Sequence, residues 1–221
     1  MSGTLSNNLF QLLGQGTLDT LLMVGIAAPV SALAGLVAGI LLTASHPLGV
    51  APSRTLHQAL ATLTNVSRSI PFLILIVLML PLTRLLVGTS IGTWAAIAPL
   101  IIGGIPYAAR LSEAALLEVD PELPQAVRAM GATTSQLMSK VYLPEALPSL
   151  LRAFTVLTIT MINFSAMAGA VGGGGLGDLA IRYGYQRFRL DVLLGTVVVL
   201  ILMVQAVQYA GNTLAQRLDR R

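Results

Sequence analysis

Few side chains in this chain could do chemistry, and none of them forms a catalytic set. His46 and His57 flank a loop without further metal ligands beside them, so histidines at a membrane boundary are favoured over a metal site. Glu113 and Glu118 do not share a helix face, which favours solvated acids at a helix end over paired catalytic carboxylates. The chain has no cysteine, which excludes disulfides, zinc–cysteine sites and thiol catalysis. We therefore expect a protein that is not an enzyme.

A glycine cluster near residue 172 has the spacing of a dinucleotide-binding fingerprint, Gly172-x-Gly174-x-x-Gly177. That fingerprint needs a strand before it and a helix after it, whereas these glycines follow a long apolar segment. A flexible, close-packed turn at the external mouth of a pathway, which also includes Gly175, is favoured. The P-loop pattern is missing as well, so we expect this chain not to bind ATP through a P-loop.

One long polar interval, residues 110–152, separates two apolar segments and predicts two short helices that meet at an elbow. Asp120 can cap the first helix, with Pro121 at the first helical position, where a missing N–H costs nothing. Gly131 supplies the left-handed residue that commonly closes a helix. A folded elbow on an otherwise lipid-soluble chain is typical of a part that fits another protein.

The second helix of the elbow begins with Thr133 and Gln136, which have the spacing of a capping box. We expect it to end at Leu143, because the residue before a proline, here Pro144, is biased out of the helical region. The elbow is therefore predicted over residues 120–143.

The composition indicates a membrane protein. The chain has 221 residues, of which 55% are hydrophobic and 10% charged, whereas soluble domains average about 25% charged residues. A transmembrane helix needs about 20 apolar residues. We predict an all-α integral membrane protein, one permease domain over residues 1–221, with five transmembrane helices. The expected spans are about 18–45, 57–82, 92–110, 147–172 and 190–214.

Two features within the spans carry further predictions. Pro71 should kink the second helix or mark its effective start. Gly35 and Gly39 form a small-xxx-small pair in the first span, which suits close contact with another helix.

The distribution of basic residues predicts the orientation. With the N-terminus outside and the C-terminus in the cytoplasm, nine Lys and Arg residues lie inside and four outside, which fits the positive-inside rule. The inside set is Arg54, Arg68, Arg110, Arg128, Lys140, Arg152, Arg217, Arg220 and Arg221; the outside set is Arg84, Arg182, Arg187 and Arg189. Because the basic residues lie at span boundaries, we expect no nucleic-acid binding. The elbow should be cytoplasmic.

The fourth span contains polar residues near the middle of the bilayer. Asn163 and Ser165 could form hydrogen bonds between helices or line a pathway, and both interpretations stay open. Met167 lies among small residues, where its flexible thioether could plug a narrow axis as a gate. No acidic or basic residue lies deep within the spans, so free energy for pumping must come from a partner at the elbow.

The elbow resembles the cytoplasmic coupling loop of ABC-importer permeases. Their pattern is Glu-Ala-Ala, three residues, Gly, nine residues, then Ile-x-Leu-Pro. This chain has Gln125-Ala126-Val127, Gly131-Ala132 and Val141-x-Leu143-Pro144, with Gln in place of Glu and Val in place of the second Ala. The resemblance implies that these residues couple the chain to an ATPase. The change of Glu to Gln weakens the case for a charge-dependent dock at that position.

Further segments look like the methionine-importer permeases of this family, which are type I importers. They include Ser67-Arg-Ser-Ile-Pro-Phe72, Ala129-Met-Gly-Ala132, Leu143-Pro-Glu-Ala-Leu-Pro148 and Ser165-Ala-Met167. The resemblance implies a pathway for methionine, of L or D configuration, that works by alternating access in the lipid of a bacterial inner membrane.

The resemblance also implies the assembly. The expected partners are a second copy of the chain, two cytoplasmic ATP-binding subunits that hold ATP and Mg, and an external methionine-binding lipoprotein. No cofactor is expected on this chain. The alternatives are a permease for another amino acid or glycine betaine, or a channel or structural subunit that works without ATP.

Overall fold

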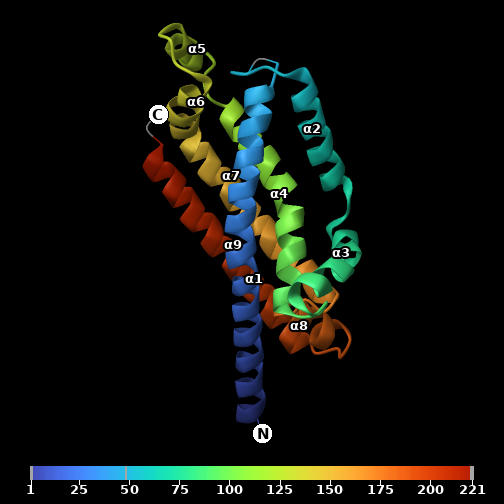
Figure 1. The fold of residues 1–221 in the computed structure, drawn as a ribbon. Helices are drawn as coiled ribbons and strands as arrows, with labels where there is room; N and C mark the ends of the chain where they lie inside the picture. Colours follow the sequence, from blue (N-terminus) through green and yellow to red (C-terminus); the bar gives the residue numbers. More distant parts are fainter. Residues whose placement is uncertain (1, 48, 220–221) are drawn as a thin grey trace. The chain divides into compact units, whose positions relative to one another are not determined.

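A computed structural model describes residues 2–47 and 49–219; these residues are mostly helical and contain no strand. Figure 1 traces the helices in chain order from blue to red. The bounds are α1 Ser2–Ser45, α2 Arg54–Ser69, α3 Phe72–Val87, α4 Thr93–Leu117, α5 Glu122–Ala129, α6 Thr134–Leu137, the π-helical turn η1 Met138–Tyr142, α7 Leu143–Ala170, α8 Gly175–Leu179, the π-helical turn η2 Ala180–Tyr185 and α9 Leu190–Leu218.

The contacts within the chain define two compact units, each assembled from separate segments. Unit 1 comprises Met1–Pro29, Ile70–Gly103 and Thr158–Val207, and unit 2 comprises Val30–Ser69, Gly104–Leu157 and Gln208–Arg221. The single permease domain expected over residues 1–221 stays a prediction, and each unit is described by itself.

Unit 1 has its core around α8 and the start of α9. Leu176, Leu179 and Val192 are buried there, and apolar side chains from α1 and α9 pack against them. Elsewhere in the unit, the ring of Phe72 at the start of α3 stacks on that of Phe164 in α7, with ring centroids 4.0 Å apart. The aromatic stack anchors the beginning of α3 to α7.

Unit 2 has its core where the elbow meets α4 and α7. The buried residues of this elbow core are Val50, Ala115, Leu116, Val119, Leu137, Met138, Val141, Tyr142, Ala146 and Leu150. Apolar side chains of α1 and α5 pack on the same cluster. Burial of this apolar surface ties the short elbow helices to the long ones.

Several helices are long and apolar enough to cross a membrane. Within the described residues these are Leu9–Ser45, Thr93–Leu117, Thr134–Ala170 and Leu190–Leu218, and α2 with α3 qualifies as a fifth, broken span. The break falls beside Pro71, whose carbonyl accepts hydrogen bonds from Ile74 and Leu75 as α3 begins. Pro71 therefore marks the start of a new helix, which is one of the two outcomes that the sequence predicted.

The helices extend beyond the expected spans at several ends. Helix α1 begins at Ser2 rather than near residue 18, α4 continues to Leu117 rather than 110, and α9 continues to Leu218 rather than 214. The added residues include polar ones. They can stay helical because a helix can continue past the apolar layer into water while its backbone stays hydrogen-bonded.

The prediction that the second elbow helix ends at Leu143 is wrong. Leu143 has helical dihedrals, φ −65° and ψ −47°, and its N–H donates to the carbonyl of Met138 across the wide π turn η1. The helix therefore runs through Pro144 from Thr134 to Ala170. A proline inside a helix costs about 3 kcal/mol, but each buried Leu, Val or Met side chain of the elbow core contributes about 1.5–3 kcal/mol. Packing on both sides of Pro144 outweighs the local bias.

The expected close contact at Gly35 and Gly39 is confirmed, and the neighbouring helix is α4. A Cβ atom at Gly35 would lie 2.3 Å from the Cβ of Ala108, and one at Gly39 would lie 2.6 Å from that of Ser112. Ala108 and Ser112 are themselves four residues apart, so small residues meet small residues on both helices. A larger side chain on either side would push α1 and α4 apart.

The contact predicts that Gly35→Val destabilises the protein. The new side chain would clash with the backbone of α4, which cannot move aside as a flexible side chain would, at a cost of about 1–3 kcal/mol. Thermal unfolding of the purified protein in detergent measures the effect. Gly25→Val is the matched control, because a Cβ atom at exposed Gly25 meets no atom within 4 Å. Equal melting temperatures for the two variants would contradict the contact.

Candidate coupling and translocation sites

The first elbow helix, α5, is held at both ends as the sequence predicted. The Asp120 carboxylate accepts a hydrogen bond of 2.9 Å from the N–H of Glu122, and Pro121 between them has helical dihedrals. At the other end Gly131 has φ +89°, the left-handed conformation. The N–H of Gly131 donates to Arg128, and that of Ala132 donates to Val127. These two bonds form a Schellman motif, which satisfies the last carbonyls of the helix.

The second elbow helix begins with the expected capping box. The Gln136 N–H donates to the Thr133 hydroxyl at 3.3 Å, and the Gln136 side chain accepts from the Thr133 N–H at 2.9 Å. The box starts α6 directly after Gly131, so α5 and α6 meet at a sharp turn (Figure 1).

The elbow has one face on the core and one face open. Val127 and Ala132 pack against the elbow core, whereas Gln125, Ala126 and Gly131 are exposed. Met130, beside the glycine, is 81% exposed. An exposed methionine next to small residues forms an adaptable apolar contact.

Two further residues of the coupling pattern lie outside the elbow turn. Leu143 packs against the elbow core and Pro144 is exposed, both at the start of α7. They therefore belong to the long helix that continues from the elbow, rather than to the exposed turn around Gly131.

The predicted pathway residues of α7 separate onto different faces. Asn163 and Met167 are exposed, and Met167 is 47% exposed. Ser165 is buried instead, and its hydroxyl donates to the carbonyl of Ile162 at 2.7 Å. Asn163, Met167 and the exposed Ala170 follow one another at spacings of four and three residues, which places them on one helix face.

The glycine cluster forms a tight turn between α7 and α8 in unit 1. Gly172, Gly174 and Gly175 have φ values of +85°, +78° and +76°. The carbonyl of Gly172 accepts from the N–H of Gly92, at 2.8 Å. Only glycine adopts such a run of positive φ angles without strain.

Close packing requires a glycine at position 177. A Cβ atom at Gly177 would lie 2.2 Å from the backbone oxygen of Ala166. The hydroxyl of buried Thr20 in α1 also accepts a hydrogen bond from the N–H of Leu176, at 2.9 Å. The glycines therefore let α8 fold back onto α7, and no strand precedes them within the described residues.

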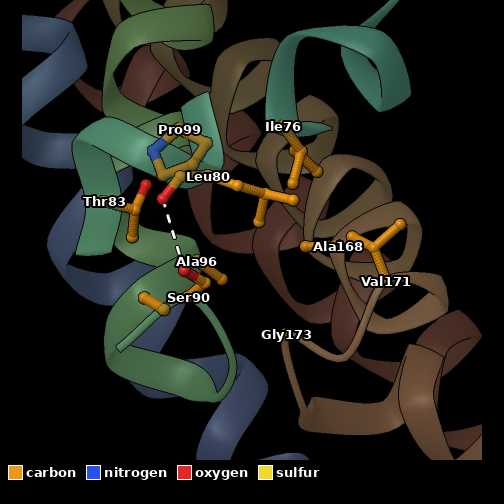
Figure 2. A pocket seen from close by; sticks show the side chains of 10 residues that line it. Ile76, Leu80, Thr83, Ser90, Ala96, Pro99, Ala168, Val171 and Gly173 are labelled. Atoms are coloured by element: carbon orange, nitrogen blue, oxygen red, sulfur yellow. Dashed lines mark hydrogen bonds between the residues drawn. The ribbon is translucent and has the colours of Figure 1, made fainter. Parts of the chain in front are cut away.

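A small cavity lies beneath this turn in unit 1. Its volume is about 10 Å³, and it is lined by residues of α3, α4 and the end of α7. Figure 2 shows Ser90 at its edge, where the Ser90 hydroxyl donates to the carbonyl of Leu80 at 3.3 Å. A space of this size holds about one water molecule. It is too small for an amino acid, so it is not a substrate pocket.

An ion pair with one buried partner, in unit 2, was missed by the sequence reasoning. Glu113, expected to be solvated, is only 6% exposed and forms an ion pair of 2.5 Å with Arg110. Arg110 also donates to the Asn65 side chain at 2.8 Å, which connects α4 to α2. The i,i+3 spacing of Arg110 and Glu113 was the available signal. Burial on α4 overturns the expectation for Glu113, because α4 does not end near residue 110.

The arginines of the predicted external segment are largely engaged with neighbours. Arg182 pairs with Asp178, and the Arg187 guanidinium lies 4.8 Å from the ring centroid of Tyr183. Arg189 pairs with Asp191, and that hydrogen bond raises the pKa of the Arg189 guanidinium. These contacts tie the segment between α8 and α9 to both helices, and the two acids offset the positive charge of Arg182 and Arg189.

Comparison with known proteins identifies the family. Residues 16–221 match the family model described as the inner membrane component of binding-protein-dependent transport systems. The chain belongs to this family. It is a membrane-embedded transport permease subunit rather than an enzyme.

Its relatives share most of its length. The chain is 49% identical to a probable D-methionine transport system permease protein MetI of Vibrio cholerae, over 95% of this chain and 93% of that protein. It is 43% identical to the methionine import system permease protein MetP of Bacillus subtilis, over 75% of this chain and 76% of that protein.

Solved structures show the same fold. An inward-facing structure of the MetNI methionine ABC transporter matches with a TM-score of 0.93 at 43% identity, covering 95% of this chain and 97% of that one. The fold is thus the type I importer permease fold that the sequence predicted. A crystal structure of an amino acid ABC transporter with histidines matches at 21% identity with a TM-score of 0.77, which shows the likeness of the fold alone.

Proposed function

We propose that the chain forms the translocation pathway of an ATP-driven importer of methionine. The observation that carries the proposal is the match over nearly the whole chain to permeases named for methionine transport. In this assembly two copies of the chain bind two cytoplasmic ATP-binding subunits, which hold ATP and Mg. An external methionine-binding protein delivers the substrate.

The elbow is the docking element for the ATP-binding subunit. Exposed Gln125, Ala126 and Met130 provide its contact face, and the caps at Asp120, Gly131 and Thr133 make it rigid enough to transmit force. The distribution of Lys and Arg favours a cytoplasmic elbow and an external N-terminus. Closure of the ATP-binding subunits would then move the elbow and rock the attached helices.

The exposed face of α7 is the surface that meets the second copy of the chain. An amide such as that of Asn163 cannot face hydrocarbon without a partner, and a two-fold axis places an identical amide opposite it. Met167 on the same face would then close the passage as a gate. On the external side, the turn that contains Gly172 and Gly174 forms the mouth.

The substrate is tested by transport competition. The assembled complex with its binding protein, in proteoliposomes that contain ATP, should accumulate labelled methionine. Unlabelled L- or D-methionine should compete, whereas histidine and glycine betaine should not. Competition by glycine betaine or histidine alone would indicate a permease for glycine betaine or for another amino acid. Uptake without ATP would indicate a channel.

Docking of the elbow predicts that Gly131→Glu uncouples ATP hydrolysis from uptake. A Cβ atom at Gly131 meets no atom of this chain within 4 Å beyond the neighbouring residues, so the new side chain starts in open space, where a docked partner would meet it. We expect methionine uptake to fall at least about tenfold while ATP hydrolysis continues. Gly131→Ala is the control, since it carries the same backbone strain at φ +89° without the projecting charge. Normal uptake by Gly131→Glu would refute the docking assignment.

The gate role of Met167 predicts a leak in Met167→Ala. Removing the thioether would leave a gap at the two-fold axis, so preloaded methionine should escape from proteoliposomes in the absence of ATP. Met167→Leu keeps a similar side-chain volume and should stay tight. Equal efflux from the alanine variant, the leucine variant and the unmodified protein would rule out a gate at this position.

A further inference from the structure

A pocket lies beneath the exposed face of α5, on the side of the elbow that carries Arg128. Its volume is about 70 Å³, several times the roughly 10–15 Å³ that one water molecule needs. Val50, Pro124 and Tyr142 line it and are buried, so they form an apolar floor. Gln125 and Arg128 also line it and are exposed, so they form a polar rim. All of these residues belong to unit 2.

The guanidinium at this rim lacks an acidic partner within the described part of the chain. Arg110, Arg152, Arg182 and Arg189 each form an ion pair with an acidic side chain, but Arg128 does not. Gln125, three residues earlier and on the same helix face, is neutral. The acids of this segment, Asp120 and Glu122, precede Arg128 by a turn and a half or more, and the Asp120 carboxylate already accepts the cap hydrogen bond. The rim is therefore cationic.

The chemistry of the pocket selects its occupant. An apolar floor beneath a guanidinium and an amide suits a carboxylate on a short aliphatic stem: methylene groups contact proline and valine, and the oxygens face the polar rim. A guanidinium holds a carboxylate by two parallel hydrogen bonds. A bare phosphate would leave the floor empty, and an apolar side chain would leave Arg128 without a counter-charge.

We infer that this pocket receives an acidic side chain of the ATP-binding subunit, with Arg128 and Gln125 as the groups that hold its carboxylate. The inference rests on the proposed docking of the elbow and adds the chemistry of the contact. In this inference Arg128 carries the charge that binds the ATP-binding subunit. Gln125 stands where the family pattern has Glu, and it contributes only a neutral amide.

Charge substitution at Arg128 tests the inference in the assembled complex. Arg128→Glu should weaken association with the ATP-binding subunit by about tenfold or more, and Arg128→Gln by less, because only the first sets two negative charges against each other. Arg217→Glu is the matched control: Arg217 is exposed in the same unit, lies near the end of α9 outside the elbow, and does not line the pocket, so its substitution should change association less than about twofold. Subunit exchange followed by fluorescence at several salt concentrations measures these affinities.

A charge exchange identifies the partner residue. Acidic residues of the ATP-binding subunit are changed to Lys one at a time and combined with Arg128→Glu. The inference requires that one exchange restores association and methionine uptake. Failure of every exchange, or association of Arg128→Glu equal to that of Arg217→Glu, would overturn it. Calorimetry measures the binding of free glutamate. If Arg128→Glu abolished that binding but left association with the ATP-binding subunit unchanged, the pocket would bind a soluble anion and the inference would be overturned.

A cross-link separates this inference from the proposed function. The chain contains no cysteine, so Met130→Cys introduces a single thiol at the exposed tip of the elbow. Cross-linking of this thiol to the ATP-binding subunit, combined with no effect of Arg128→Glu, would refute the acidic contact and leave the docking intact. Absence of any cross-link during active uptake would refute the docking itself.

Discussion

Lipid offers no hydrogen bonds, so every backbone N–H and C=O that crosses it must be paired within the chain. This requirement explains why the described residues are helical and why the helices are so long. It also explains where the chain departs from regular helix. At Pro144 the π turn η1 redirects a backbone hydrogen bond from Leu143 to Met138, which keeps the helix continuous through a proline. At the elbow, where α5 ends, Gly131 and Ala132 donate to the free carbonyls.

Helices in lipid gain little from hydrophobic association, so they depend on close approach of small residues. The contact of Gly35 and Gly39 with α4 follows this rule in unit 2, and that of Gly177 with Ala166 follows it in unit 1. The same close packing gives the Gly172–Gly177 segment a structural reason that does not involve a nucleotide. The proposed mechanism would depend on stiff contacts of this kind, because loose packing would absorb force applied at the elbow.

Several charges are paired within the chain. Arg110 pairs with buried Glu113 on α4, where an isolated charge would be costly, and Arg152 pairs with Asp219 near the end of α9. On the elbow, Arg128 remains available beside an apolar pocket. An unpaired cation on a rigid, capped helix is suited to recognition, because a partner's carboxylate can pair with it without displacing an internal contact.

The sequence by itself determined the helical membrane class, the capped elbow, an interruption of the helix at Pro71 and the small-residue pair of Gly35 and Gly39, because each depends on local backbone chemistry or composition. Tertiary structure decided the rest. Burial on the elbow core carried the helix through Pro144, and burial on α4 turned Glu113 from a solvated acid into an ion-paired one. Folding also separated Ser165 from Asn163 and placed Arg128 over a pocket whose floor comes from three segments. These features cannot be predicted from local sequence, because they depend on which residues, distant in the chain, pack against one another in the fold.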